Sequence, residues 1–480
     1  MFFSVYTLGC KLNQLETEAI TDSFCRAGFS FFPWGHIPSV PGPMQPSLMI
    51  INTCTVTSMA DQKARRLIRK TLREHPAACL IVTGCYAQME KDALAELEDN
   101  PGRLFVIPGE NKDRILDLPA FLAGITHALP AELRSSDLSH LISTWLASFS
   151  LYKGEDESKG KDGSFRFTPE NFTSHSRGFL KIQDGCDHRC TYCRVSLARG
   201  KSRSLGAKEV LEALRSLETR GFAEAVLTGV NITQYRDGSM TLAGLLEFLL
   251  SKTKTIRLRL SSIEPDGLEP EKFTGEFIHA VTNHRIRPHF HLSLQSGSGE
   301  ILTKMGRPYS PEDIERTLTL LRSVRDDPFL ACDIITGFPG ETGAEFEKTF
   351  SLCQRAGFAW IHAFPFSPRP GTAAYDLPGK PDERDARQRV ESLTELARKG
   401  RREYLGRWEG REVEAIVETG KGLAKGFVPG LSENYLKLLV SCSGEEVPRP
   451  GASVHCRIGK PIIGGEPSWI THFDAQAELV

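Results

Sequence analysis

Short apolar segments alternate with amphipathic ones over much of this chain, and this alternation limits the fold more than any other feature. Near the N-terminus the segments SVYTLGC, SLMIINTC and CLIVTGC each lead into a stretch with helical spacing of apolar residues. Fully apolar strands that alternate with helices are typical of a parallel sheet. The sequence therefore predicts a parallel α/β domain over residues 1–124.

Each of these three segments ends on a cysteine, namely Cys10, Cys54 or Cys85. Ligands of a parallel sheet collect outside the carboxyl ends of its strands. We therefore expect the three thiols to converge on one crevice. A single cysteine of this kind would most simply be a buried, inert thiol. That simpler interpretation is kept for the other cysteines within helical or strand patterns: Cys25, Cys79, Cys332, Cys353, Cys442 and Cys456.

The rest of the chain divides into three parts. Residues 125–176 include the polar run GEDESKGKDG and are expected to form a linker without chemistry of its own. Residues 177–408 contain six strand-helix units, which predict a partial barrel of the TIM type with function at its C-terminal rim. Short alternating strands in residues 409–475 predict a small β-barrel.

The composition limits the compartment and the partners. A net charge of -1 over 480 residues gives no overall nucleic-acid signature, so any RNA must be bound by local basic patches. The N-terminus lacks the basic and apolar regions of a signal peptide, and no apolar run is long enough to span a bilayer. We expect a cytoplasmic protein without a membrane partner. Its 12 cysteines would stay reduced there, which favours metal ligands over disulfides.

The segment DGCDHRCTYC places Cys186, Cys190 and Cys193 at C-x3-C-x2-C spacing directly after the first predicted barrel strand. A structural zinc site usually needs four Cys or His ligands, and only His188 lies nearby. Three thiolates around a 4Fe-4S cluster leave one iron open, which S-adenosylmethionine can chelate. The spacing therefore favours a radical cluster over zinc.

Over nearly its full length the chain resembles the radical S-adenosylmethionine methylthiotransferases. The resemblance is carried by the six cysteines above and by the segments LTGVNITQY, RLSSIEP, HLSLQSGSGEILTKMGRPY, DIITGFPGET and FSPRPGTAA. It implies that Cys10, Cys54 and Cys85 hold a second 4Fe-4S cluster, whose open iron carries the sulfur to be inserted. It also implies that the C-terminal β-barrel is an RNA-binding TRAM domain.

The sequence segments around the cysteines indicate which branch of that family the chain resembles. LGCKLNQLE and NTCTVTSMADQK resemble the enzymes acting on N6-threonylcarbamoyladenosine in tRNA more than the branch acting on dimethylallyladenosine. The branch acting on a ribosomal protein fits less well. One departure is Ser196, which stands where the family usually has proline. It leaves the cysteine ligands intact and puts the conformation of the loop in question.

Polar residues at the ends of the barrel strands are candidate contacts to S-adenosylmethionine, because the function of such barrels lies at this rim. An exposed strand-end residue is equally often a cap. Tyr192, between two cysteines, could flank the adenine or pack against the cluster loop. The candidates are Tyr192, Gly229, Asn231, Ser262, Glu264 and Gln295.

RNA contacts are expected in two places. Residues 177–208 carry eight Lys or Arg against two Asp, which suits phosphate contacts around the cluster loop and includes Arg199 and Arg203. The segment GLSENYLKLLV, with Tyr435 and Lys437, resembles the TRAM strand that would meet tRNA. Residues 384–411 are also basic, but such runs are usually solvated helix faces.

The sequence thus predicts an enzyme that converts N6-threonylcarbamoyladenosine at position 37 of tRNA to its 2-methylthio derivative. By the family's logic, one S-adenosylmethionine methylates the sulfur and a second supplies the 5′-deoxyadenosyl radical. The expected cofactors are two 4Fe-4S clusters and S-adenosylmethionine. The expected partners are the anticodon loop of tRNA, an electron-donor protein and a sulfur donor, and the chain is expected to be a monomer. The alternatives are methylthiolation of dimethylallyladenosine and a non-catalytic iron-sulfur or zinc protein that binds RNA.

Overall fold

The chain folds into two compact units in the computed structural model, which describes residues 1–37, 45–98, 102–125, 135–151, 163–172, 175–265, 276–420, 423, 426–442, 447–462 and 473–480. The first unit comprises Met1–Thr173 together with Asp184–Asp187 and Cys193–Lys201. The second comprises Ser174–Gln183, His188–Tyr192 and Ser202–Val480. No helix within the described ranges is both long and apolar enough to cross a membrane.

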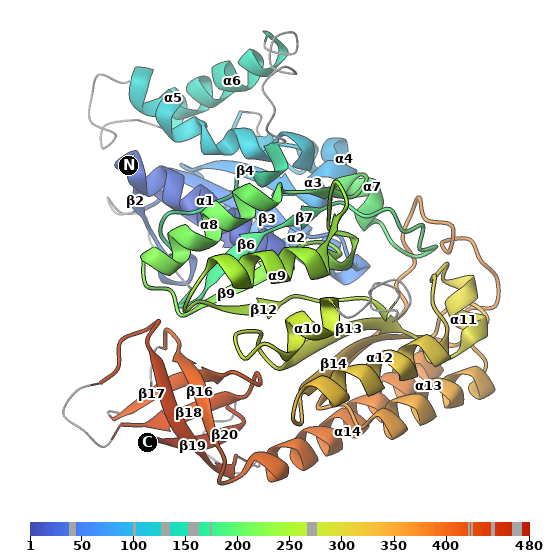
Figure 1. Cartoon of the computed structure of the whole chain (residues 1–480). Coiled ribbons are helices and arrows are strands. Elements are labelled where there is room, and N and C mark those ends of the chain that lie inside the picture. Colours follow the sequence, from blue (N-terminus) through green and yellow to red (C-terminus); the bar gives the residue numbers. More distant parts are fainter. Residues whose placement is uncertain are drawn as a thin grey trace. The chain divides into compact units, whose positions relative to one another are not determined.

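A five-stranded parallel sheet with strand order β2-β1-β3-β4-β5 forms the first unit (Figure 1). Its strands are β1 (Phe2–Thr7), β2 (Ser30–Phe31), β3 (Leu48–Thr53), β4 (Cys79–Gly84) and β5 (Leu104–Val106). The helices are α1 (Lys11–Arg26), α2 (Ser58–Glu74), α3 (Cys85–Met89), α4 (Lys91–Ala95), α5 (Leu118–Ile125) and α6 (Ser135–Leu151). The parallel α/β fold predicted for this region is confirmed.

Alternate residues of β3 face two separate cores. Ile50 packs in one cluster with Phe24 of α1, and Ile51 packs in the other with Ile68 of α2. Both β3 and β4 are buried along their whole length. Helices therefore cover both faces of the sheet, which explains the fully apolar strands in the sequence.

Helix α6 lies within the segment that was expected to be only a linker. Its Leu138, Ile142 and Trp145 are buried in the same cluster as Phe24. These residues recur at helical spacing, so one apolar stripe of α6 faces the core. The polar run at residues 154–163 falls almost entirely outside the described residues.

Six parallel strands form the partial barrel of the second unit. They are β6 (Gly178–Lys181), β9 (Glu224–Thr228), β12 (Arg257–Leu260), β13 (His289–Gln295), β14 (Phe329–Thr336) and β15 (Trp360–Pro365). The order is β12-β9-β6 in one sheet and β13-β14-β15 in the other, and single parallel bridges such as Ile263 to Leu292 join the two. The described helices are α8 (Ala207–Thr219), α9 (Leu242–Lys252), α10 (Glu276–Thr282), α11 (Gly299–Lys304), α12 (Pro311–Val324) and α13 (Gly343–Ala356). All six predicted barrel strands are present.

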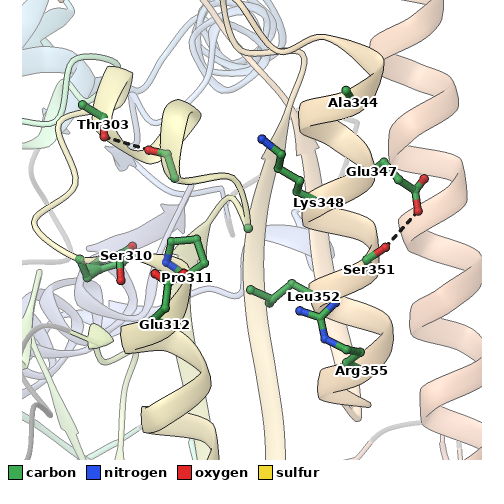
Figure 2. Close-up of a pocket in the computed structure, with 13 residues that line it drawn as sticks. Thr303, Ser310, Pro311, Glu312, Ala344, Glu347, Lys348, Ser351, Leu352 and Arg355 are labelled. Atoms are coloured by element: carbon green, nitrogen blue, oxygen red, sulfur yellow. Dashed lines mark hydrogen bonds between the residues drawn. The ribbon is translucent and has the colours of Figure 1, made fainter.

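An open cavity of about 640 Å³ lies among α11, α12 and α13 (Figure 2). Charged side chains on its wall include Glu312, Glu347, Lys348 and Arg355. None of the expected cofactor residues lines it. We therefore do not assign the cofactor to this cavity.

The long helix α14 (Glu383–Trp408) leads into a closed five-stranded barrel, which confirms the small C-terminal β-barrel. Its strands are β16 (Glu412–Val417), β17 (Phe427–Ser432), β18 (Lys437–Ser441), β19 (Ser453–Pro461) and β20 (Ala475–Leu479). Most basic residues of α14 form ion pairs with acidic neighbours, as Arg401 does with Asp474 and Arg407 with Asp327. The positive charge of this helix is therefore largely balanced by neighbouring acidic groups.

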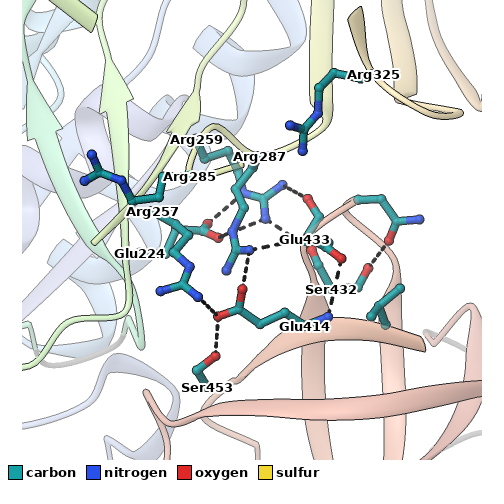
Figure 3. A network of polar contacts seen from close by, with 12 residues as sticks. Glu224, Arg257, Arg259, Arg285, Arg287, Arg325, Glu414, Ser432, Glu433 and Ser453 are labelled. Atoms are coloured by element: carbon teal, nitrogen blue, oxygen red, sulfur yellow. Dashed lines mark hydrogen bonds and ion pairs between the residues drawn. The ribbon is translucent and has the colours of Figure 1, made fainter. Parts of the chain in front are cut away.

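A buried charge network joins the C-terminal barrel to the six-stranded barrel (Figure 3). The Glu224 carboxylate on β9 accepts hydrogen bonds from Arg259 Nε at 2.6 Å and Arg287 Nε at 2.8 Å. Arg287 also donates to Glu414 on β16 at 2.9 Å, and Arg259 donates to the Ser432 carbonyl at 3.2 Å. Burial would raise the pKa of Glu224, but the two guanidinium groups outweigh it and hold that pKa well below its usual range.

The variant Glu224→Gln tests this network by leaving Arg259 and Arg287 with an uncharged partner. Removing one member of a buried ion pair costs about 3–5 kcal/mol. We expect a loss of that size in the free energy of unfolding, measured by chemical denaturation at pH 7. Because the folded pKa of Glu224 is depressed, its contribution is complete above the unfolded value of about 4.3 and is lost as the pH falls below it.

The control for this prediction is Arg387→Ala, since the Arg387–Glu383 pair on α14 is 73% and 88% exposed. Exposed pairs contribute at most about 1 kcal/mol. Equal effects of the two variants would contradict a structural role for the buried network.

Candidate functional site

The first three predicted cysteines lie at one edge of the first unit's sheet. Strand β1 pairs with β3 up to Thr7 and Asn52, and β3 pairs with β4 up to Thr53 and Gly84. Cys10, Cys54 and Cys85 follow these aligned ends. Burial, together with the neighbouring Cys10 and Cys85 thiols, raises the pKa of Cys54 to about 12. The structure thus brings the three cysteine turns to the same edge of the sheet, and their role as cluster ligands stays a prediction.

Two glycines allow the three cysteine turns to approach one another. Gly9 has a φ of +113°, and a side chain there would place its Cβ 2.9 Å from Cys54 Sγ. Gly84 has a φ of +100°, and its Cβ would lie 2.6 Å from the Thr53 backbone nitrogen. Only glycine suits such backbone conformations at such close approach. The turns before Cys10 and Cys85 thus depend on glycine.

Asn13, which the sequence analysis missed, ties two of the turns together. Its buried amide nitrogen donates to the Leu8 carbonyl at 2.8 Å and to the Thr53 carbonyl at 3.0 Å. These carbonyls precede Cys10 and Cys54. The position of Asn13, three residues after Cys10 in the first helical turn, was visible in LGCKLNQLE.

The second predicted set, Cys186, Cys190 and Cys193, lies in the loop after β6. Cys193 Sγ accepts a hydrogen bond from the Val195 backbone nitrogen at 3.3 Å, at the start of the short helix α7 (Val195–Arg199). The helix forms with Ser196 in the place of the family's proline. Cys190 Sγ lies 3.1 Å from Arg307 Nη1. Arg307 was part of a quoted segment, but its contact with the cysteine was not foreseen.

Glu264 was expected to contact S-adenosylmethionine, but its carboxylate binds protein groups. It lies 2.8 Å from Arg307 Nη2 and 2.8 Å from His188 Nδ1. Since Arg307 also contacts Cys190, this geometry favours a role in holding the cysteine loop. We therefore assign Glu264 to holding this loop and not to a contact with S-adenosylmethionine.

Two other candidate cofactor residues lie close together at the end of β9. The Asn231 backbone nitrogen donates to Gln183 Oε1 at 2.9 Å, and a Cβ at Gly229 would lie 2.8 Å from the same oxygen. The Asn231 amide nitrogen is buried and has no hydrogen-bond partner among the described residues. A buried polar atom of this kind calls for a ligand or water.

The remaining candidates have separate environments. Tyr192 packs edge-on against Phe338, with ring centroids 6.4 Å apart. Gln295 adopts a φ of +65°, which is unusual for a residue other than glycine. Ser262 Oγ lies 3.2 Å from His291 Nδ1, and His291 Nε2 lies 3.1 Å from Asp333 Oδ1. His291 and Asp333 were missed, although polar residues alternate with apolar ones along both strands.

Part of the expected basic ring in residues 177–208 is buried, so that expectation is wrong in part. Arg199 is only 8% exposed and pairs with Glu16 and Asp184, each at 3.1 Å. Lys181 and Arg194 are also buried, and Arg177 is half-buried and pairs with Glu224. A guanidinium enclosed by carboxylates is not available to phosphate, and we withdraw Arg199 as an RNA contact.

Of the two RNA contacts expected in the C-terminal barrel, Tyr435 packs against other side chains, whereas Lys437 is exposed. The Tyr435 ring stacks on His289 at 3.9 Å between centroids, and the Arg259 guanidinium lies over it at 5.3 Å. Tyr435 therefore packs within the second unit and is not kept as an RNA contact. Lys437 and Arg203 are exposed and stay candidates.

Two family models match the chain. The radical SAM superfamily matches residues 180–353, and uncharacterized protein family UPF0004 matches residues 3–105. The threonylcarbamoyladenosine tRNA methylthiotransferase MtaB of Treponema pallidum is 39% identical to this chain. The matched region covers 95% of this chain and 97% of the relative. The relative of that name from Thermotoga maritima is 33% identical and covers 90% of each chain. The tRNA-2-methylthio-N(6)-dimethylallyladenosine synthase of Koribacter versatilis is 28% identical, again over 90% of each.

The chain belongs to the radical SAM methylthiotransferase family.

Membership of the radical SAM methylthiotransferases makes the chain an enzyme, and the non-catalytic alternative is set aside. Radical SAM enzymes use a 4Fe-4S cluster and S-adenosylmethionine, so these predicted cofactors are confirmed. The C-x3-C-x2-C loop remains the predicted ligand set for this cluster, because three thiolates would leave one iron open.

Among the described residues, no three His, Cys, Asp or Glu side chains lie close enough to bind one ion. The thiolates of a 4Fe-4S cluster bind different irons and stand further apart than the ligands of one zinc. The assignment of Cys10, Cys54 and Cys85 to a cluster therefore stays a prediction.

Iron content tests whether this methylthiotransferase has two cysteine sets. Protein reconstituted without oxygen should bind about eight irons, because each three-thiolate set holds one 4Fe-4S cluster. Replacing Cys186, Cys190 and Cys193 together by alanine should leave about four irons, and cleavage of S-adenosylmethionine should stop. Iron and zinc are measured by plasma emission. Stoichiometric zinc in place of iron would contradict this interpretation.

Proposed function

We propose that this enzyme replaces the C2 hydrogen of N6-threonylcarbamoyladenosine at position 37 of tRNA with a methylthio group. One observation carries the proposal. The first unit gathers three thiols of its own, in addition to the C-x3-C-x2-C loop shared by radical SAM enzymes. A second cluster there would provide a place for the sulfur that methylthiolation must insert.

The choice of nucleoside rests on the relatives. The two relatives named for threonylcarbamoyladenosine are 39% and 33% identical to this chain, whereas the one named for dimethylallyladenosine is 28% identical. The segments LGCKLNQLE and NTCTVTSMADQK support the same choice. Dimethylallyladenosine is the outcome that the substrate test must exclude.

The protein's own part in the reaction is to hold and enclose the cofactors. When bound, S-adenosylmethionine and the cluster at Cys186, Cys190 and Cys193 supply the radical that breaks a C–H bond. The Arg307 and Glu264 pair fixes the loop that carries Cys190. We propose that Cys10, Cys54 and Cys85 hold the second cluster.

Further residues are assigned roles in this proposal. Asn231, with its buried amide nitrogen, is proposed to bind S-adenosylmethionine with Gly229, Ser262, Gln295 and Tyr192. Lys437 and Arg203 are proposed to contact tRNA phosphates near the anticodon loop. An electron-donor protein and a sulfur donor would complete the system, and a monomer in the cytoplasm is the proposed working state.

The variant Cys54→Ala should separate the two half-functions. Cleavage of S-adenosylmethionine to 5′-deoxyadenosine should persist, because Cys54 is not in the C-x3-C-x2-C set. Methylthio insertion should fall to background. Both are followed by liquid chromatography with mass spectrometry on the purified enzyme, with tRNA carrying threonylcarbamoyladenosine as substrate.

The matched control is Cys79→Ala, since Cys79 is fully buried at the opposite end of strand β4. Each substitution should cost on the order of 1 kcal/mol of stability, and only Cys54→Ala should lose insertion. A Cys54→Ala enzyme that methylthiolates at the wild-type rate would contradict the second cluster. Preferred methylthiolation of tRNA carrying dimethylallyladenosine would contradict the assigned substrate.

A further inference from the structure

Arg199 is a buried arginine that the proposed reaction has not yet used. It ends helix α7, six residues after Cys193, and its side chain is 8% exposed. One of its terminal nitrogens lies 3.1 Å from Glu16 Oε1 and 3.1 Å from Asp184 Oδ1. The other donates to Asn13 Oδ1 at 3.0 Å. The guanidinium is thereby fixed in place on three sides.

Its bond to Asn13 connects Arg199 with the turns of the first cysteine set. The same Asn13 side chain donates through its nitrogen to the carbonyls of Leu8 and Thr53, next to Cys10 and Cys54. The guanidinium therefore orients an amide that holds both turns. Loss of Arg199 would leave Asn13 Oδ1 without this donor, and the amide would then be held only through its nitrogen.

The charge of Arg199 also acts on the thiols. Burial would lower its pKa, but Cys85, Glu16, Asp184 and Cys10 raise it well above its ordinary value. Glu16 is shared with the buried Lys112, with which it forms an ion pair. Without Arg199, the thiolates would lose this positive charge, and Asp184 would lose this ion-pair partner.

A buried cation next to thiolates has a defined effect on a cluster that they bind. Each added electron makes an iron-sulfur cluster more negative, and a nearby positive charge stabilises the reduced form more than the oxidised form. Net charge and hydrogen bonds near the sulfurs are established determinants of cluster potential.

We propose that Arg199 is the positioning and charge-compensating residue of the Cys10, Cys54 and Cys85 site: it fixes the turns through Asn13 and raises the reduction potential of the cluster that they hold. This inference rests on the second cluster of the proposed function. It also gives the segment after Cys193 a role at both cysteine sets, because α7 directly follows the radical loop.

The test measures the midpoint reduction potential of the cluster at Cys10, Cys54 and Cys85. In the full-length chain with Cys186, Cys190 and Cys193 replaced by alanine, only the cluster of the first set remains, and its midpoint potential is followed by electron paramagnetic resonance. Arg199→Gln should make this potential more negative and increase the rate at which a chelator removes iron. Arg199→Lys, which keeps the charge, should restore most of the potential.

The control is Arg194→Gln in the same background. Arg194 is also buried and lies in the same segment, but it pairs with Glu90 at 2.8 Å. Its loss should leave the potential of the first-set cluster close to that of the parent. A shift equal to that of Arg199→Gln would overturn the assignment to Arg199.

A second variant tests the same charge effect if Arg199→Gln fails to fold. If Arg199→Gln does not fold, Glu16→Gln is measured instead: it removes a negative charge that offsets Arg199, and a less negative potential is expected. An unchanged potential in a folded variant would overturn the inference while leaving the second cluster intact. Absence of any cluster in the parent would overturn the proposed function itself.

Discussion

The backbone pairing of parallel strands is the constraint on which the rest of this structure depends. It aligns the carboxyl ends of β1, β3 and β4, so that three cysteines far apart in the sequence reach one edge of the first unit. The same rule places the C-x3-C-x2-C loop after β6, the first strand of the second unit's barrel. Parallel strands with both faces covered must be apolar, and polar chemistry is therefore confined to their ends.

Buried arginines are the second recurring device. Around Glu224 they join strands of the six-stranded barrel to the C-terminal barrel, and at Arg199 they connect carboxylates, an amide and the cysteine turns. A buried guanidinium is costly unless its donors are satisfied. Carboxylate, backbone and amide oxygens satisfy most donors of both networks, whereas Arg287 Nη2 is buried without a hydrogen-bond partner among the described residues. Such networks hold the side chains around them in a defined geometry.

The sequence was sufficient for features with a short-range pattern, namely the apolar strands, the cysteine spacing and the closing β-barrel. It was misleading for charge, because Arg177 meets Glu224 and Arg199 meets Glu16 across 47 and 183 residues. No local pattern distinguishes a buried arginine from one that binds phosphate. Helix α6 was a different case, since Leu138, Ile142 and Trp145 carry a readable helical spacing that the flanking polar run obscured.

The most direct measurement is mass spectrometry of nucleosides from the total tRNA of a strain that lacks this enzyme. Our account predicts that 2-methylthio-N6-threonylcarbamoyladenosine disappears and that N6-threonylcarbamoyladenosine accumulates in its place. Wild-type enzyme should restore the 2-methylthio nucleoside, and the Cys54→Ala enzyme should not. An unchanged level of this nucleoside, or loss of the 2-methylthio derivative of dimethylallyladenosine instead, would contradict the account.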